Sequence, residues 1–122
     1  MRTERITLDL DKRLVEQPPL ILRHRETRAV SVSALVTDHG REIDLSQYQV
    51  SFAIALKDSY VMGLCETEGS HATFQVPSLC AEEPGFAYGY LVLEGDDVRA
   101  TTGDFGIRVI EGKEGCPCNR YT

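Results

Sequence analysis

Short stretches of alternating apolar and polar residues, separated by polar turns, run through most of the chain. The clearest alternation covers residues 50–56, and the next clearest covers residues 105–109. A period of two is typical of a β-strand that buries one face and leaves the other in water. The residues expected on the buried faces, together with an aromatic from the strand that begins near residue 86, are Val50, Phe52, Ile54, Tyr88, Phe105, Ile107 and Val109.

The apolar content is highest between residues 84 and 110. A Pro84-Gly85 turn signal precedes an aliphatic and aromatic run over residues 86–94, and Gly95-Asp96-Asp97 then reads as a second turn. The chain extends again from residue 98. This pattern predicts a hairpin of two long strands, against which the other strands pack.

Further strands are indicated over residues 6–10, 20–22, 30–36, 60–67 and 72–76. Residues 11–19 end in two prolines and predict a loop, and residues 78–83 predict a single helical turn. Seven or eight short strands with turns between them, and no sustained helical period, predict an all-β antiparallel sandwich of the immunoglobulin-like or fibronectin-like kind. We expect residues 1–110 to form this domain and residues 111–122 to form a flexible tail.

Composition and charge narrow the class of protein. The 122 residues are 42% hydrophobic and 26% charged, as in an ordinary globular domain, and the formal net charge is −6. The chain has no run of Lys or Arg that could neutralise a nucleic-acid backbone, so we expect no nucleic-acid partner. No apolar run approaches the length of a membrane span, and the first residues lack the apolar segment of a signal peptide. We therefore expect no membrane association, and synthesis and retention in a cytoplasm.

The four cysteines are expected to be free thiols, because no export signal is present. Cys116-Pro117-Cys118 would supply half of a zinc site, but structural zinc needs four ligands and the sequence offers no second pair. A flexible tail is the favoured interpretation, although an ion bridging subunits is the alternative. Cys65 lies in an apolar strand and reads as a small core residue.

The remaining chemical candidates are equally sparse. Glu66, Glu68 and His71 surround a turn and are of types that can bind a metal, yet a solvated turn is the favoured interpretation. His24 and His39 stand in polar segments without an evident partner. No nucleophile–base pair and no glycine-rich phosphate loop is recognisable. The sequence therefore predicts no enzyme, no cofactor and no bound metal.

The order of several motifs resembles the N-terminal domain of phage baseplate upper proteins. After an opening strand, residues 37–45 (TDHGREIDL) and Val50-Ser51-Phe52 form a turn followed by a strand of the family's type. The series closes with residues 101–109 (TTGDFGIRV). The family's usual Gly-Asp before the second strand is replaced here by Arg25-Glu26-Thr27. The resemblance covers roughly residues 5–110.

This resemblance implies a virion structural part encoded by a phage or a prophage and assembled in the host cytoplasm. Such domains resemble self-associating connectors that hold receptor-binding proteins on the tail tip. The resemblance implies no catalytic residues. The expected partners are other copies of the chain and other tail or baseplate proteins.

Two strands carry unusually apolar outer faces. In the strand from residue 49, the face opposite Phe52 carries small side chains, and in the strand from residue 86 both faces are apolar. A soluble sandwich strand normally alternates, so an apolar outer face indicates an interface. The residues predicted to form a homo-oligomer interface are Ala53, Ala55, Ala87, Leu91 and Leu93.

The alternative function is a carbohydrate-binding module used in host recognition. Such a site needs exposed aromatic side chains together with a few carboxylates or amides. Tyr48, Tyr60 and Tyr121 are the only aromatic residues expected near the surface. This small number favours the connector.

Overall fold

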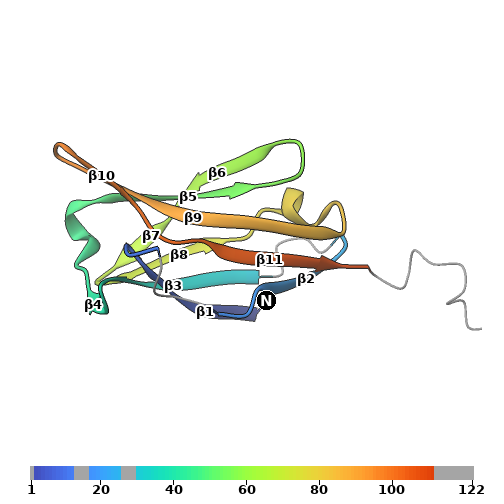
Figure 1. Ribbon diagram of the computed structural model, residues 1–122, viewed down its shortest axis with the longest axis horizontal. Coiled ribbons are helices and arrows are strands. Elements are labelled where there is room, and N and C mark those ends of the chain that lie inside the picture. The colour runs from blue at the N-terminus through green and yellow to red at the C-terminus, as the bar shows by residue number, and fades with distance from the viewer. Residues whose placement is uncertain (1, 13–16, 26–29, 112–122) are drawn as a thin grey trace, which may run out of the picture.

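Two β-sheets packed face to face make up the protein, as the computed structural model shows (Figure 1). It describes residues 2–12, 17–25 and 30–111. The described residues contain no α-helix, only the short 3-10 segments η1 (Leu45–Gln47) and η2 (Ser78–Ala81). The predicted all-β sandwich is confirmed, although the strands number eleven among the described residues rather than seven or eight.

One sheet has five strands in the order β1-β3-β8-β7, with β4 paired to β3. Every second residue of its long strands points into the sandwich, and β3 shows the rule most clearly, since Val30, Val32, Ala34 and Val36 are all buried. Its strands are β1 (Arg2–Asp9), β3 (Val30–Asp38), β4 (Arg41–Glu42), β7 (Glu66–Glu68) and β8 (His71–Gln75).

The other sheet has six strands in the order β2-β11-β9-β5-β6, with β10 paired to β9. β6 therefore ends this sheet, and Figure 1 shows it beside β5 at the top of the molecule. The strands are β2 (Leu20–Arg23), β5 (Gln49–Ala55), β6 (Tyr60–Leu64), β9 (Gly85–Gly95), β10 (Val98–Thr101) and β11 (Phe105–Ile110).

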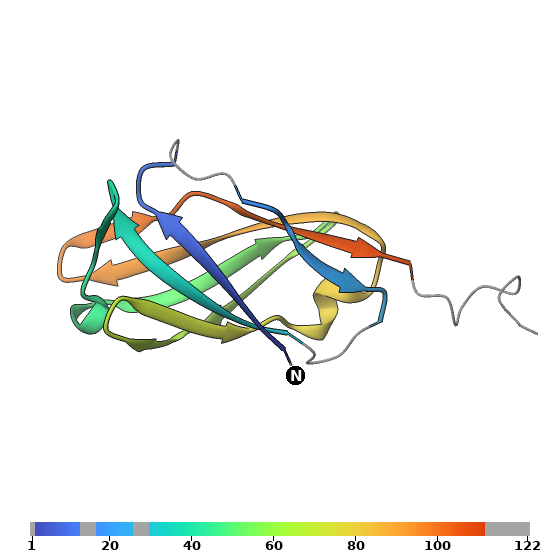
Figure 2. The ribbon, with the colours of Figure 1, turned by 90° about the horizontal axis from the view of Figure 1, so that it is seen from below.

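Each sheet contains one parallel pair, where a purely antiparallel arrangement was predicted. β1 runs parallel to β3, and β2 runs parallel to β11. Figure 2 shows both pairs with their arrows pointing the same way. The pairs arise because the chain alternates between sheets at its start: β1 lies in one, β2 in the other, and β3 returns to the first. A connection through the opposite sheet leaves β1 and β3 parallel, which a direct hairpin would not.

The predicted hairpin of residues 84–110 has a divided return limb. β9 pairs with β10 near its C-terminal end and with β11 near its N-terminal end. Between them, buried Thr102 exchanges bonds with Leu91: the Thr102 Oγ1 accepts from the Leu91 N–H at 3.0 Å, and the Thr102 N–H donates to the Leu91 carbonyl at 3.0 Å. Gly103 then donates to the Asp9 carbonyl of the opposite sheet.

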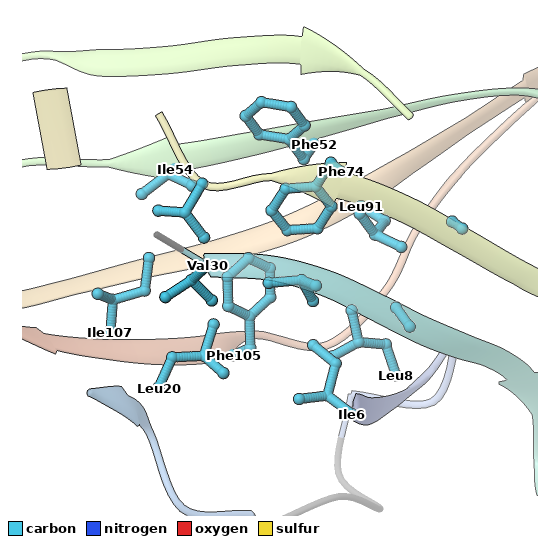
Figure 3. Close-up of a cluster of buried hydrophobic side chains, with 14 of the residues drawn as sticks. Ile6, Leu8, Leu20, Val30, Phe52, Ile54, Phe74, Leu91, Phe105 and Ile107 are labelled. Carbon is cyan, nitrogen blue, oxygen red and sulfur yellow. The ribbon is translucent and has the colours of Figure 1, made fainter. Parts of the chain in front are cut away.

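Three phenylalanine rings join the two sheets at the centre of the core (Figure 3). Phe74 of β8 stacks on Phe52 of β5, with ring centroids 4.5 Å apart, and lies 5.9 Å from the ring of Phe105 in β11. Small residues make room for these rings: a Cβ on Gly63 would lie 2.7 Å from the Phe52 ring, and one on Gly89 would lie 2.6 Å from the Phe105 ring. The six predicted core residues that are buried here are Val50, Phe52, Ile54, Phe105, Ile107 and Val109.

Tyr88, the seventh residue predicted in the core, lies on the outer face of the six-stranded sheet and is 57% exposed. The prediction had assigned the two faces of β9 the wrong way round. Its core face carries Ala87, Gly89, Leu91 and Leu93 instead. The physical reason is that a buried tyrosine hydroxyl needs a hydrogen-bond partner, whereas small and aliphatic side chains fit beside the Phe105 ring.

The described residues cover the predicted domain, residues 1–110, more fully than the predicted tail, residues 111–122. The last strand, β11, ends at Ile110, next to the predicted domain boundary. Residues 112–122, with Cys116 and Cys118, lie outside the described residues, so the tail and its metal alternative stay predictions.

Candidate interaction face

Large apolar side chains gather on the outer surface of the six-stranded sheet. Tyr60, Met62 and Leu64 project from β6 and are 67%, 56% and 67% exposed. Phe86 and Tyr88 of β9 and Ile21 of β2 lie on the same side. These six residues, which we call the apolar face, are six of the eight large hydrophobic residues exposed in the described part of the chain. Scattered exposed apolar residues are normal, but such a concentration on one face is not.

Strand register explains why these residues lie together. Ala55 of β5 pairs with Tyr60 on one side and Tyr88 on the other, so one row of the sheet carries two tyrosines around a small residue. Ala53 pairs with Met62 and Tyr90 in the next row. Residues directly opposite each other in an antiparallel pair point to the same face. The small side chains of β5 therefore separate the large ones of β6 and β9.

The predicted interface residues divide between two locations. Ala53 and Ala55 lie on the outer side of the sheet, in the rows just described. Ala87, Leu91 and Leu93 do not: each is at most 5% exposed and packs in the core. This corrects the predicted interface, and it follows from the reversed faces of β9. The residues missed by the sequence analysis are Phe86, Met62, Leu64 and Ile21. They lie on strands with neighbouring apolar residues on both faces, so the pattern does not show which face is buried.

A cation lies within the apolar face, on β11 between Ile21 of β2 and Phe86 of β9. The Arg108 guanidinium carbon is 5.9 Å from the centroid of the Phe86 ring, within the range of a cation–π contact. Arg108 also pairs with Ile21 across β2 and β11. Aromatic residues, methionine and arginine are the types enriched in protein–protein interfaces.

The outer surface of the five-stranded sheet is polar by comparison. Its strands alternate between buried aliphatic residues and outward hydroxyl or charged ones; the outward residues of β1, β3 and β8 include Thr3, Arg5, Thr7, Ser31, Ser33 and Thr73. This is the apolar-in, polar-out alternation expected of a sheet with one solvated face. The two outer surfaces thus differ in kind.

A surface cavity of about 350 Å³ lies at one end of the sandwich, between the β5–β6 turn, η2 and the start of β9. Apolar residues and charged ones share its wall, with Phe86 connecting it to the apolar face. The charged residues are Lys57, Asp58, Glu82 and Glu83.

The candidate metal and thiol residues are placed as follows. Glu68 pairs with His71 across the β7–β8 hairpin. Both residues and the nearby Glu66 are exposed. Among the described residues, no cluster of three or more His, Cys, Asp or Glu side chains is arranged to hold a metal. Burial raises the pKa of the Cys65 thiol to about 12 and that of Cys80 to about 11. Both thiols are therefore protonated at neutral pH and poor nucleophiles.

Both histidines thought to lack partners have them. The His24 ring is 2.8 Å from the Glu82 carbonyl. His39 lies 2.8 Å from Asp38 and 3.3 Å from Asp11. The hydrogen bond to Asp38, together with the negative charges of the nearby carboxylates, raises the pKa of His39 above its usual value, and a smaller desolvation opposes this. These contacts tie surface turns together.

Asp9 is a buried carboxylate at the end of β1 that accepts four hydrogen bonds. Its Oδ2 accepts from the Thr37 hydroxyl at 2.6 Å and the Gly40 N–H at 2.8 Å. Its Oδ1 accepts from the N–H groups of Asp11 at 2.7 Å and His39 at 3.0 Å. Burial alone would raise the pKa of Asp9, but the four bonds outweigh it and hold the pKa well below its usual value. Because its four bonds join the end of β1 to β3 and to the turn groups that follow these two strands, Asp9 has a structural role.

In the part of the chain that the structure describes, no helix is long and apolar enough to cross a membrane.

Comparison with solved structures identifies a phage protein of the same fold. The chain is similar to the N-terminal domain of phage TP901-1 ORF48, with a TM-score of 0.69 and 14% sequence identity. The match covers 89% of this chain and 99% of the other. At this identity the similarity shows the fold alone. It confirms, at the level of the fold, the phage resemblance found in the sequence motifs. No family model matches the sequence, and no curated protein matches it either.

Proposed function

We propose that this protein is a non-enzymatic structural part of a phage tail or baseplate, a self-associating connector that holds receptor-binding components on the tail tip. Two independent lines support this: the motif order resembling baseplate upper proteins, and the fold shared with a phage protein domain. The place of action is then the virion, after assembly in the cytoplasm of the bacterial host.

The observation that carries the proposal is the apolar face. Six large side chains exposed on one sheet, with one arginine among them, form a surface that water solvates poorly and another protein would cover. Specific protein interfaces bury about 800 Å² on each partner, around apolar and aromatic anchors with a polar rim. Tyr88 lies within this face, two strands from the sheet edge at β6, and is the anchor we expect to matter most.

The test is sedimentation of the wild type and of Tyr88→Glu. We expect the wild type to form an oligomer at tens of micromolar, and the variant to stay folded but sediment at a lower mass, because a carboxylate in the face would be desolvated by a partner that covers it. Thr3→Glu places the same charge on the polar outer surface of the five-stranded sheet and should leave the oligomer intact. A monomeric wild type, or a folded Tyr88→Glu that keeps the oligomeric mass, would contradict the proposal.

A carbohydrate-binding module is the second candidate, and the structure gives it a specific observation. The exposed aromatic residues differ from those that the sequence suggested. Phe86 and Tyr88 join Tyr60 at the surface, whereas Tyr48 is partly buried against the core. Phe86 borders the cavity that also presents Asp58, Glu82 and Glu83, the combination of ring and carboxylates that sugar sites use. Glycan-array binding that is lost in Phe86→Ala and kept in Thr3→Glu would favour this function over the connector.

A further inference from the structure

The edge strand β6 lacks the features that normally keep a sheet edge from pairing with another strand. Natural edges are protected by charged residues, prolines or bulges. β6 reads Tyr-Val-Met-Gly-Leu, with no charge and no proline. The edge strands of the five-stranded sheet are different: β1 carries Arg2, Glu4 and Arg5, and β7 carries Glu66 and Glu68.

The free backbone groups of β6 belong to the residues of the apolar face. The Leu56 N–H donates to the Ser59 carbonyl at 2.8 Å, and the Cys65 N–H donates to the Val50 carbonyl at 2.9 Å. These bonds mark hydrogen-bonded positions of the β5–β6 pair, and such positions alternate along an antiparallel ladder. Val61 and Gly63 therefore point their N–H and C=O groups toward β5. The N–H and C=O groups of Tyr60, Met62 and Leu64 point away from β5, along the open edge.

The same three residues are symmetric about Met62. If a second β6 approaches in antiparallel orientation with Met62 opposite Met62, Tyr60 lies opposite Leu64 at both ends. All three positions are then hydrogen-bonded pairs, because their free groups face the partner strand. The paired side chains are apolar and project from one face, which stabilises a cross-strand pair.

Only this register matches apolar residues along the whole strand. A shift of two residues in one direction brings Glu66 opposite Tyr60, and a shift of two residues in the other direction brings Asp58 opposite Leu64. Such a shift would leave a carboxylate against an apolar side chain, so the Met62-centred register is specified by the sequence. In the Met62-centred register Asp58 lies opposite Glu66 of the partner subunit. Both residues are outside β6, where salt screens the repulsion between their carboxylates.

We propose that the occupant of this edge is a second copy of the chain, joined through antiparallel β6–β6 pairing centred on Met62. The pairing has a two-fold axis perpendicular to the sheet, as in an isologous dimer. The two six-stranded sheets then form one continuous sheet, and both apolar faces lie on the same side of it. This inference rests on the self-association proposed above and adds a contact at the β6 edge. Tyr88 on β9 does not reach that edge, so Tyr88→Glu should remove contacts through the apolar face and keep the edge pairing.

Hydrogen exchange on the full-length wild type tests the pairing without a mutation. The amides of Tyr60, Met62 and Leu64 should exchange rapidly in dilute solution and slow by about tenfold or more as the concentration is raised into the dimer range. The amides of Val61 and Gly63, already bonded to β5, should change much less. Stacking through the apolar face alone would not make this alternation.

Met62→Pro provides the matching variant. Proline is tolerated where the N–H of an edge strand faces solvent, so the β5–β6 pair should survive while the central donor is lost. We expect loss of the dimer mass in sedimentation. Thr3→Glu, on the polar outer surface of the five-stranded sheet, serves as the control, which should retain the alternating protection.

The outcomes separate this inference from the proposed function. A dimer with concentration-dependent protection of Tyr60, Met62 and Leu64 supports both. An oligomer in which these amides stay unprotected overturns the edge pairing and leaves the connector standing. A chain that stays monomeric with unprotected β6 amides at every concentration overturns both.

Discussion

Asp9→Asn tests how much the buried carboxylate contributes to the fold. Each Asp9 oxygen accepts two hydrogen bonds, so an amide of the same size can keep only the pair at its remaining oxygen. With the oxygen kept at the Oδ1 position, the bonds from Asp11 and His39 survive. The Thr37 hydroxyl can turn to accept from the new NH₂ group. The Gly40 N–H then faces another donor and loses its partner.

An orphaned buried donor costs about 1–3 kcal/mol, and hydrogen bonds to a charged acceptor are stronger than those to a neutral one. We therefore expect Asp9→Asn to lower the free energy of unfolding by about 2 kcal/mol at pH 7. Asp9→Ala removes all four bonds and should cost more. Thr37→Val removes only the hydroxyl bond, in a side chain of similar shape, and should cost about 1 kcal/mol.

The effect should depend on pH in a defined direction. The pKa of Asp9 is lower in the folded state than in the unfolded chain, where a typical aspartate has a pKa of about 3.9. Its stabilisation is therefore fully present above that value and declines as the pH falls toward the folded-state pKa. Urea unfolding followed by circular dichroism at pH 7 and pH 3 measures both quantities. Asp9→Asn within about 0.5 kcal/mol of the wild type at pH 7, or a difference that widens in acid, would refute this account.

Three further predictions concern the core. Gly89→Ala should destabilise the fold by about 1–3 kcal/mol in urea unfolding, because its Cβ would meet the Phe105 ring at 2.6 Å and the Ala53 carbonyl at 2.9 Å; a neutral result would mean that the ring moves freely. Leu91→Glu should fail to fold at all, by circular dichroism, because it places a charge on a fully buried position; a folded variant would place Leu91 at the surface. Cys80 should react with a disulfide reagent only in urea, because its raised pKa and burial suppress the thiolate; rapid labelling of the native protein would contradict this.

Much of the fold follows from local patterns in the sequence. The period-two alternation in residues 50–56 and 105–109 correctly marks β5 and β11, and the turn signals mark most strand ends. The helical turn expected at residues 78–83 corresponds to η2. The parallel pairs were not predicted, because β1 and β3 are joined through a strand in the opposite sheet, and no local pattern records which distant strands become neighbours.

The exposed apolar residues lie on the sheet where the sequence analysis expected an apolar outer face, but on the other side of β9. Both faces of that strand are apolar, so hydrophobicity alone cannot choose between Tyr88 and Leu91. Two sequence signals could have decided it: the tyrosine hydroxyls at positions 88 and 90, and the small residues Ala87 and Gly89, which leave room for a large partner in the core. The set of bonds to Asp9 had no such signal, because three of the four donors lie about thirty residues away, on β3 and in the turn that follows it.

The contrast between the two outer surfaces bears on how the protein would sit in an assembly. β1, β3 and β8 direct hydroxyl and charged side chains outward, so water solvates that surface well. The six-stranded sheet directs Tyr60, Met62, Phe86 and Tyr88 outward, and its β6 edge also presents unpaired backbone groups. A partner on the polar surface would have to displace well-bound water and would gain little free energy of binding. A partner on the apolar face would instead remove poorly solvated apolar surface from water, which is favourable. Assembly should therefore be one-sided, with the five-stranded sheet left facing solvent.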